Sequence, residues 1–435
     1  MGTLKRAIGL PTATALVVGT IIGSSIFVQA SEITSLVPNP TLVILAWAVA
    51  GVLTLVGALV CAELASAYPR TGGLYVFLNE IYAPSVGFLW GWAMVWTMHG
   101  GILAAIATVF ARYAGVFLPL NDVTTRMVAI GAIAVLSVIN YFGVRFGGGL
   151  QSAFTLVKVI AVLAIIVLGF YFDAGRIPPT VEGVIGGMQM SPIIPPANFF
   201  LAVGAGLFAF GGWHMVTYTA GETVDPGRTI PRSLIIGVAI VTICYIGLNA
   251  VYLSVLPLEA VMKSTRVAAD TFSVLIGPRA AGAIAALVLF SSFGALNGIV
   301  LVGPRVYYQM AQDGLFFRWA SHLHPVYQTP DRAIILQAVI ASVLVATGSY
   351  RALFTRVIYT EWIFFALLAL GVILMRRRPG YAPAWRMPLV PIAPILFVIV
   401  SLLIVVNQIR ANWQDAAIGL AIVATGIPAY YLWRK

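Results

Sequence analysis

Apolar stretches of about 20 residues recur along the whole 435-residue chain. They are apolar throughout and do not alternate with period two, as strands of a membrane barrel would. Because hydrocarbon offers no hydrogen bonds, spanning segments of this kind must be helices. Only 9% of the residues are charged and 60% are hydrophobic, whereas soluble domains carry about a quarter charged residues. The sequence therefore predicts an all-α membrane protein, with one integral membrane domain over residues 1–435.

Twelve segments are candidate transmembrane helices, because each combines sufficient length with few charges. They cover residues 7–28, 42–65, 88–110, 127–142, 153–172, 199–220, 234–256, 281–302, 333–347, 358–375, 391–406 and 416–432. The connecting loops are short, which leaves little protein for a catalytic or recognition domain outside the lipid.

The distribution of Lys and Arg sets the expected orientation in the membrane. With the amino terminus in the cytoplasm, fifteen of the 25 basic residues fall in cytoplasmic segments and nine outside. This bias predicts a multi-pass protein of the cell membrane, plasma or inner, with both termini in the cytoplasm. The formal charge of +11 does not indicate a nucleic-acid partner, because no basic patch is interleaved with aromatic residues.

Two of the predicted spans carry a break near their middle. Gly23-Ser24-Ser25 interrupts the first span and Gly211-Gly212 interrupts the sixth. Glycine costs a helix about 1 kcal/mol relative to alanine, so such breaks need a reason. Matched breaks in the two halves of a chain indicate inverted repeats around a binding site at the bilayer midplane.

The two repeats would cover residues 7–172 and 198–375, with two added helices in residues 388–433. Five spans per repeat is an odd number, so the second repeat would be inverted across the membrane relative to the first. A plainer interpretation stays open, in which Gly19, Gly23 and the glycines of the sixth span serve close helix packing.

A helix that breaks inside the membrane exposes N–H groups where its second half begins and carbonyls where its first half ends. At the first break, the N–H groups of Ser24, Ser25 and Ile26 could hold a carboxylate. Carbonyls near Ile21 could accept hydrogen bonds from an ammonium group. The sixth span offers further carbonyls, those of Phe208, Ala209 and Gly211. Together the two breaks predict a receptor for a zwitterion, which indicates an α-amino acid as the small-molecule substrate.

Four ionisable residues within or near the spans require an explanation. Lys158 lies well inside the fifth span, where an ionisable group is costly unless it faces a cavity or a partner. An interfacial lysine that snorkels is the alternative. Glu361 is either a gating or proton-carrying carboxylate, or an interfacial residue beside Arg356. Glu63 and Glu222 are expected to form structural pairs with nearby arginines.

Other classes of function lack their signatures. Cys61 and Cys244 both lie in apolar spans, and no Cys/His cluster offers a metal site. Zinc-protease, Walker and nucleophile-elbow motifs are absent from the sequence, so we expect no metal, no cofactor and no enzyme. An ion channel would need repeated filter segments or rings of charged pore residues, and neither is present.

Three stretches resemble the amino acid–polyamine–organocation (APC) superfamily, and most closely its L-type amino acid transporter branch. They are residues 19–27 (GTIIGSSIF), 57–73 (from GALVCAEL to PRTGG) and 208–232 (from FAFGGW through GET to IPR). The motifs are specific in combination, and the resemblance runs from the first span to the twelfth. It implies a five-plus-five inverted-repeat fold, with discontinuous helices 1 and 6, and transport by alternating access.

The resemblance also implies roles for individual residues. It places the substrate carboxylate on the backbone of Ser24 and Ser25. It places the substrate ammonium on the carbonyls of Ile21, Phe208 and Gly211, with Phe208 as an aromatic gate over the site.

Lys158 matches a family lysine whose ammonium stands where sodium-coupled relatives hold a cation. The hydroxyls of Ser291 or Ser292 in the eighth span would lie near it. Tyr245 in the seventh span and Asn297 in the eighth match polar positions near the family's site. The resemblance therefore implies sodium independence.

The chain departs from the family pattern at three places. Ser25 stands where the family usually has glycine, which favours small neutral substrates. His214 stands where relatives often have asparagine, and it either faces the substrate or packs as a satisfied histidine. The loop from Pro119 to Arg126 lacks the cysteine that bridges animal members to a heavy chain. We therefore expect a prokaryotic-like member with no disulfide-linked partner.

These observations predict a sodium-independent exchanger of small neutral L-amino acids. Two alternatives stay open at this point: a proton-coupled amino acid symporter, and a transporter of cationic amino acids or polyamines.

Overall fold

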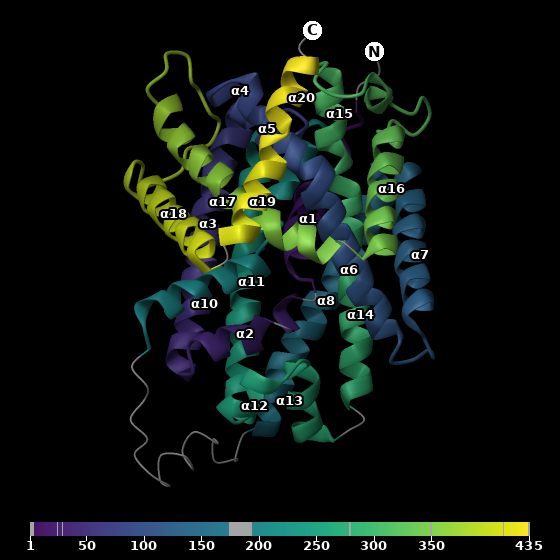
Figure 1. Ribbon diagram of the computed structural model, residues 1–435, viewed down its shortest axis with the longest axis vertical. Coiled ribbons are helices and arrows are strands. Elements are labelled where there is room, and N and C mark those ends of the chain that lie inside the picture. The colour runs from purple at the N-terminus through teal and green to yellow at the C-terminus, as the bar shows by residue number, and fades with distance from the viewer. Residues whose placement is uncertain are drawn as a thin grey trace.

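A computed structural model describes residues 4–23, 25–27, 29–173, 194–277, 280–348, 350–411 and 413–433 (Figure 1). Within these ranges, residues 280–281 and 350–358 are described by their backbone alone. The regular elements of the described residues are helices, accompanied by one isolated β-bridge between Ile8 and Thr223. The chain begins and ends at the same end of the molecule, marked N and C in Figure 1, which we call the terminal side.

The first part of the chain begins with a broken helix and continues through long apolar helices. Its elements are α1 (Leu10–Ile21), η1 (Ser25–Phe27), α2 (Gln29–Leu36), α3 (Pro40–Ala67), α4 (Leu74–Ile81), α5 (Pro84–Ala93), η2 (Met94–Met98), α6 (His99–Ala114), α7 (Asp122–Tyr141) and α8 (Val144–Asp173). α5, η2 and α6 run on as one apolar helix, in which η2 is a π-helical turn.

The second part begins in the same way, with a second broken helix. Its elements are α10 (Pro196–Ala209), η3 (Trp213–Glu222), α11 (Pro226–Val255), α12 (Leu258–Lys263), α13 (Val267–Ile276), α14 (Ala280–Val302), α15 (Pro304–Gln312), η4 (Arg318–Ser321), α16 (Asp331–Thr347), α17 (Tyr350–Met375), α18 (Ile392–Ala411), α19 (Trp413–Ala424) and α20 (Gly426–Trp433). η1, η3 and η4 are 3-10 helices.

Each predicted apolar segment contains one or more helices over its described residues, which confirms the all-α prediction. Among the described residues, nine helices are long and apolar enough to cross a membrane. Three shorter apolar helices accompany them, at Leu10–Ile21, Val267–Ile276 and Tyr359–Met375. The chain is therefore a multi-pass membrane protein, while twelve crossings and the inverted repeat stay predictions.

Several helix starts follow directly from local sequence. Asn39 caps α3, because its side-chain oxygen accepts from the N–H of Leu42 at 3.1 Å. Pro40 then occupies the first helical turn, where no N–H partner is needed. Asn121 and Thr124 form a reciprocal capping box at the start of α7.

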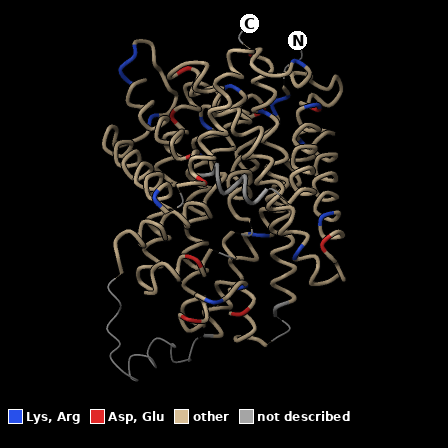
Figure 2. The backbone as a smooth tube through the Cα atoms, viewed as in Figure 1, with Lys and Arg blue, Asp and Glu red and all other residues tan. Residues whose placement is uncertain are grey.

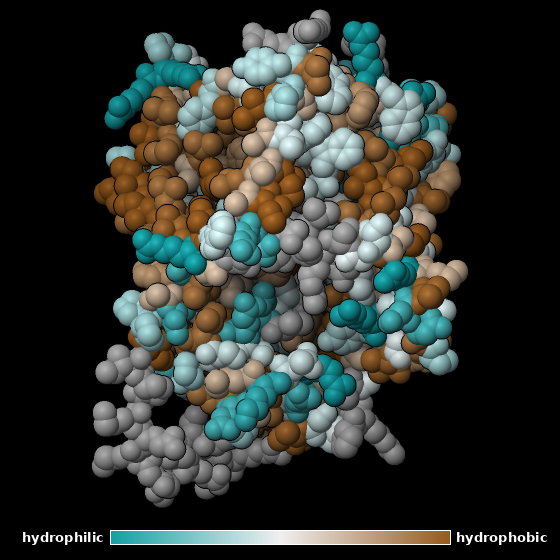
Figure 3. Space-filling view, in the orientation of Figure 1, coloured by the Kyte–Doolittle hydropathy of each residue, from teal (hydrophilic) through white to brown (hydrophobic). Residues whose placement is uncertain are grey.

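Helix α1 lies at the centre of the molecule and packs against α8, α11, α14 and η3 (Figure 1). α11 also packs along α3, α14 along α6, and α17 along α18. Figure 2 shows charged residues mainly towards the two ends of the molecule. Figure 3 shows apolar side chains over the flanks formed by α18 and by α7 and α16. Apolar flanks between polar ends are what a lipid-embedded protein presents.

Both predicted helix breaks are present, and they lie against each other. α1 ends at Ile21, and helical structure resumes with η1 at Ser25. α10 ends at Ala209, and η3 follows after a bend. In that bend Gly212 has a φ of +100°, and a Cβ there would lie 3.1 Å from the carbonyl oxygen of Thr20. The bend therefore needs glycine, both for its conformation and for its contact with α1.

The packing interpretation holds for one glycine of α1 and fails for another. A Cβ at Gly19 would lie 1.9 Å from Nε2 of Gln151 and 2.5 Å from Oγ1 of Thr155. Gly19 therefore lets α1 approach α8 closely. Among the described residues, a Cβ at Gly23 would meet Ala295 alone, at 3.6 Å. Close packing does not explain the break at Gly23.

Candidate functional site

A cavity of about 780 Å³ begins at the two helix breaks. The breaks contribute Ile21, Gly23, Ser25, Phe208, Ala209, Gly211 and Gly212 to its lining. From there the cavity leads between α2, α6 and α10, away from the terminal side (Figure 1). Glu32 of α2 and Arg112 of α6 line it towards that opposite side. The cavity thus gives the midpoint of the molecule access to one side.

One hydroxyl group links the carbonyl ends of both breaks. The Oη atom of Tyr245 lies 3.1 Å from the carbonyl oxygen of Ile21 and 3.0 Å from that of Ala209. A hydroxyl carries a single hydrogen and donates to one of them at a time, so the other carbonyl keeps accepting capacity. Ser25 Oγ also lies 3.5 Å from the Ala209 oxygen, and the Gly23 N–H donates to Ile21 at 2.8 Å. Carbonyls of both broken helices thus converge on one spot, as an ammonium group requires.

Phe208, Ile26 and Ser24, the other predicted residues of the breaks, differ in their relation to the cavity. Phe208 lines the cavity and is 37% exposed, as an aromatic gate requires. Its carbonyl accepts from the N–H of Gly211 at 3.0 Å. Ile26, which follows Ser25 in η1, is buried. Ser24, the other predicted carboxylate ligand, lies outside the described residues.

Lys158 is fully buried on α8 and holds the end of α1. Its Nζ donates to the carbonyl oxygens of Ile22 at 2.7 Å, Ser291 at 3.1 Å and Gly19 at 3.3 Å. An ammonium group has three hydrogens, so its donors are satisfied by these three carbonyls. Such burial rules out the snorkelling alternative, because that places the ammonium in water.

The two serines of α14 play different parts from those expected. Ser291 contacts Lys158 through its backbone carbonyl, while its hydroxyl lies 3.4 Å from the carbonyl oxygens of Ile22 and Gly23. The hydroxyl of Ser292 donates within its own helix, to Val288. Only Ser291 therefore takes part in the contact between Lys158 and α1.

Asn297 lies behind the cavity, in the packing between α7, α8 and α14. Its Nδ2 donates to Oε1 of Gln151 at 2.9 Å and to the carbonyl of Gly147 at 3.1 Å. Its Oδ1 accepts from Nδ2 of Asn140 at 2.9 Å. Asn297 does not line the substrate cavity that the described residues form. A direct contact with substrate is therefore not supported for this residue.

His214 and Glu361 both line the cavity, although α17 and η3 are far apart in sequence. Both ring nitrogens of His214 and one carboxylate oxygen of Glu361 are buried without a hydrogen-bond partner among the described residues. His214 is therefore not a satisfied packing histidine. Glu361 is only 7% exposed and is not a surface residue.

Comparison with known proteins decides the family. The amino acid permease family matches residues 8–427 of the chain. The chain belongs to this family. The serine/threonine exchanger SteT of Bacillus subtilis (strain 168) is 31% identical over 99% of the chain and 98% of its own length.

Human relatives of this permease are similar over nearly its whole length. The b(0,+)-type amino acid transporter 1 is 31% identical over 99% of the chain and 88% of its own length. The cystine/glutamate transporter is 28% identical over 99% of the chain and 86% of its own length. These similarities confirm the predicted APC superfamily and L-type branch, and the protein is an amino acid transporter of that branch.

On the terminal side, the permease is closed by two ion pairs, one fully buried and one with a partly exposed arginine. Glu222, at the end of η3, accepts from Arg305 of α15 at 2.7 and 2.8 Å, and both side chains are at most 1% exposed. Glu63 of α3 accepts from Arg376 at 2.9 and 2.6 Å. The predicted pairing of both glutamates with arginines is confirmed. The backbone N–H groups of Ala7 and Ile8 also donate to the carbonyl of Glu222.

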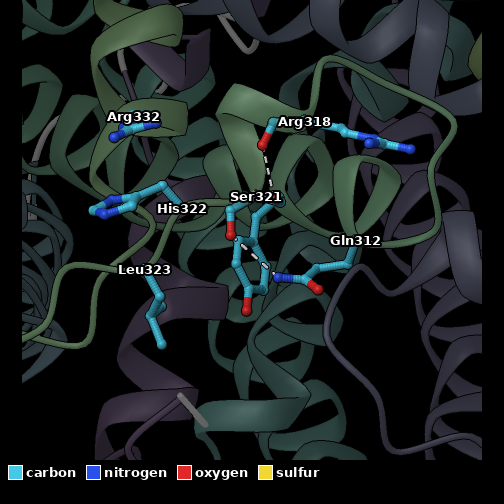
Figure 4. Close-up of a pocket in the computed structure, with 7 residues that line it drawn as sticks. Gln312, Arg318, Ser321, His322, Leu323 and Arg332 are labelled. Carbon is cyan, nitrogen blue, oxygen red and sulfur yellow. Dashed lines mark hydrogen bonds between the residues drawn. The ribbon is translucent and has the colours of Figure 1, made fainter. Parts of the chain in front are cut away.

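A second cavity, of about 360 Å³, lies between α15, η4 and α16 of the permease (Figure 4). The amide of Gln312 donates to the carbonyl of Ser321 at 3.1 Å there, and Arg318 and Arg332 flank that bond on opposite sides. None of its lining residues lines the main cavity, and no helix break reaches it. It is therefore not the candidate substrate site.

Some contributors to the site escaped the sequence analysis. The hydroxyl of Thr20, which lies 2.7 Å from the Leu16 carbonyl of its own helix, also lies 3.2 Å from the carbonyl of Gly212 and so brings the two breaks into contact. Trp213 and Phe365 line the cavity with ring centroids 5.1 Å apart. The burial of Arg305 was not predicted, because its sequence context does not differ from that of the arginines expected in loops. The π-helical turn η2 was also missed, because a π-helix has no strong sequence signal.

Proposed function

We propose that this transporter exchanges small neutral L-amino acids across the cell membrane, at one site between the two helix breaks. The observation that carries the proposal is that the Ile21 and Ala209 carbonyls of the two broken helices meet at the hydroxyl of Tyr245, and that both residues line a single cavity. A substrate ammonium would bind these carbonyls, and the N–H groups at the start of the first break would bind its carboxylate. Such a site selects a zwitterion by its two opposite charges.

The proposed topology is twelve crossings with both termini in the cytoplasm. Spans one to five and six to ten would form inverted repeats, residues 7–172 and 198–375, followed by two added helices in residues 388–433. In support, each proposed repeat begins with a broken helix, α1 to α2 and α10 to η3. The terminal side would then face the cytoplasm.

Sodium independence is proposed from the environment of Lys158. Its ammonium already occupies the space among the carbonyls of Gly19, Ile22 and Ser291, each within 3.3 Å. These carbonyls would otherwise be available to a metal cation, since hard cations prefer oxygen ligands. A fixed ammonium leaves no room there for a transported sodium ion.

Exchange is proposed over proton symport because SteT, 31% identical over nearly the whole chain, is named an exchanger. Small neutral substrates are proposed because Ser25 places a side chain in the cavity wall where the family usually has glycine. Cationic amino acids and proton coupling stay as alternatives, favoured by the unpaired Glu361 in the cavity.

Alternating access would open and close opposite ends of the same cavity. The cavity leads away from the terminal side, and the buried Glu222–Arg305 pair lies across that side. The structure thus corresponds to the outward-facing state of the proposed cycle. If the broken helices and their neighbours tilted against the remaining helices, the cavity would open towards the terminal side.

A disulfide-linked partner is not proposed. The chain has two cysteines, Cys61 and Cys244, and both are buried and unpaired. A bond to a second chain requires a thiol at the surface.

Purified protein in liposomes tests the proposed function. Uptake of labelled serine should require unlabelled amino acid inside, should be unchanged when sodium is replaced by choline, and should not follow a pH gradient. Uptake into empty liposomes driven by a pH gradient would instead establish proton symport.

A further inference from the structure

We infer that Glu361 and His214 form a subsite that recognises a hydrogen-bond donor on the substrate's side chain. This inference rests on the proposed function, because it assumes that the two breaks hold the substrate's ammonium and carboxylate. It adds which amino acids the cavity prefers: those with a hydroxyl or amino group, over apolar side chains of the same shape.

The first support is the state of the Glu361 carboxyl group. It lies near the middle of α17, is 7% exposed, and lines the cavity. Among the described residues, its Oε1 atom has no hydrogen-bond partner and no ion pair of Glu361 is found. A buried polar group without a partner is costly, so native proteins rarely keep one without a use. Glu361 can therefore accept a hydrogen bond from a donor group bound in the cavity.

The second support is His214, two residues after the bend at Gly212. Its ring is 1% exposed and lines the same cavity, and within the described part of the chain neither Nδ1 nor Nε2 has a partner. A neutral imidazole offers one donor and one acceptor, whichever tautomer is present. His214 can therefore accept from a substrate donor, or donate to its oxygen.

Phe365 brings the two groups into one wall of the cavity. Its ring centroid lies 5.1 Å from that of His214. It follows Glu361 by four residues on α17, so both side chains lie on the same helix face. Glu361, His214 and the backbone acceptors at Ile21 and Ala209 all line one cavity. A small amino acid held at the breaks would thus present its side chain to this wall.

Other charged or titratable groups do not take this role. Lys158 is committed to three carbonyls of α1 and α14. Glu32 and Arg112 line the cavity further from the terminal side, on α2 and α6. Tyr218 packs against His214, and His99 packs against Tyr218, but neither lines the cavity. Tyr359 also lines the cavity, but its hydroxyl donates to the carbonyl of Ala416. Glu361 and His214 are thus the ionisable side chains of the described cavity wall that have buried polar atoms without a partner.

Threonine and valine form the sharpest probe pair, since they share a shape and differ by a hydroxyl in place of a methyl group. In liposomes loaded with unlabelled serine, each would compete with labelled serine for uptake. We expect threonine to compete at least about tenfold better than valine in the native protein, because one buried acceptor is satisfied only by threonine.

Variants then assign the preference to residues. Glu361→Leu removes the acceptor, and His214→Phe keeps a ring without nitrogen; both should reduce the threonine preference to about threefold or less while valine still competes. Glu361→Gln keeps an acceptor oxygen and should retain most of the preference. Glu259→Gln on α12, whose side chain is 83% exposed, is the matched control and should behave as the native protein.

Two results would overturn the subsite. One is equal competition by threonine and valine in the native protein, a measurement that does not depend on the folding of any variant. The other is a preference unchanged in both Glu361→Leu and His214→Phe, which would mean that water satisfies these groups. Failure of the proposed function looks different, because the native protein would then exchange no amino acid at all.

Discussion

The Nζ atom of Lys158 lies 2.7 Å from the carbonyl oxygen of Ile22, the C-cap residue that follows α1. This contact joins α8 to the first helix break and leaves the broken end capped by a positive charge. A helix end carries partial negative charge on its free carbonyls, so a fixed ammonium stabilises it. The same contact therefore explains how an interrupted helix persists inside the membrane.

Replacing Lys158 with alanine should reduce amino acid exchange by about tenfold or more. Three buried carbonyls would lose their donor, and each such loss costs about 1–3 kcal/mol. The measurement is initial uptake in liposomes at matched protein content. Lys263→Ala on α12, at an exposed lysine, is the control. Normal uptake by the Lys158 variant would refute its assigned role.

Tyr245→Phe should weaken substrate binding by about fivefold. The variant removes the hydroxyl that holds the Ile21 and Ala209 carbonyls together, and the lost hydrogen bond has a net free energy of about 1 kcal/mol. Tyr252→Phe is a matched control on the same helix, since the Tyr252 hydroxyl is buried and no described residue pairs with it. Competition curves for serine measure both. Equal effects of the two variants would argue against a special role for Tyr245.

Glu222→Gln should destabilise the closed terminal side. It leaves the buried Arg305 without its counter-charge, which costs about 3–5 kcal/mol in buried pairs. We expect a lower Tm. We also expect a cysteine introduced on the cavity side of the ion pair to react faster with a thiol reagent added from the terminal side. The double variant Glu222→Gln, Arg305→Met should recover much of the Tm, because neither charge is then stranded. A double variant less stable than Glu222→Gln alone would contradict this account.

Ser25→Gly should widen substrate acceptance towards larger amino acids. The change removes a side chain from the cavity lining, together with the long contact of its hydroxyl to the Ala209 carbonyl at 3.5 Å. The measurement is competition by leucine and phenylalanine against labelled serine. Ser35→Gly, at an exposed serine of α2, controls for backbone flexibility. An unchanged competition profile would show that another group limits substrate size.

Helix breaks were predictable from the sequence, whereas the partners of their free groups were not. Gly23 and Gly211-Gly212 stand out in apolar runs, because glycine is unfavourable there. The acceptors of Lys158 come from two other helices, 133 to 139 residues away along the chain. Such contacts depend on how α1, α8 and α14 pack, and no local pattern records that.

The faces of α14 illustrate the same limit. Ser291 and Asn297 were both expected near the site, and only Ser291 contacts the broken helix. Six residues separate them, which turns the helix by about 240° beyond one full turn at 3.6 residues per turn. The sequence identified two polar residues in one span, but the direction of each depended on helix rotation.

Composition and the apolar runs alone determined that this chain is helical and lies in lipid, because backbone polar groups have no other way to be satisfied there. Sequence also located the two interruptions and the buried lysine, since each violates what hydrocarbon favours. Only the tertiary structure decided that the interruptions meet, that Glu361 and His214 line one cavity, and that Asn297 does not. Those outcomes depend on distances between helices far apart in the chain, which are fixed by packing and not by any local run of residues.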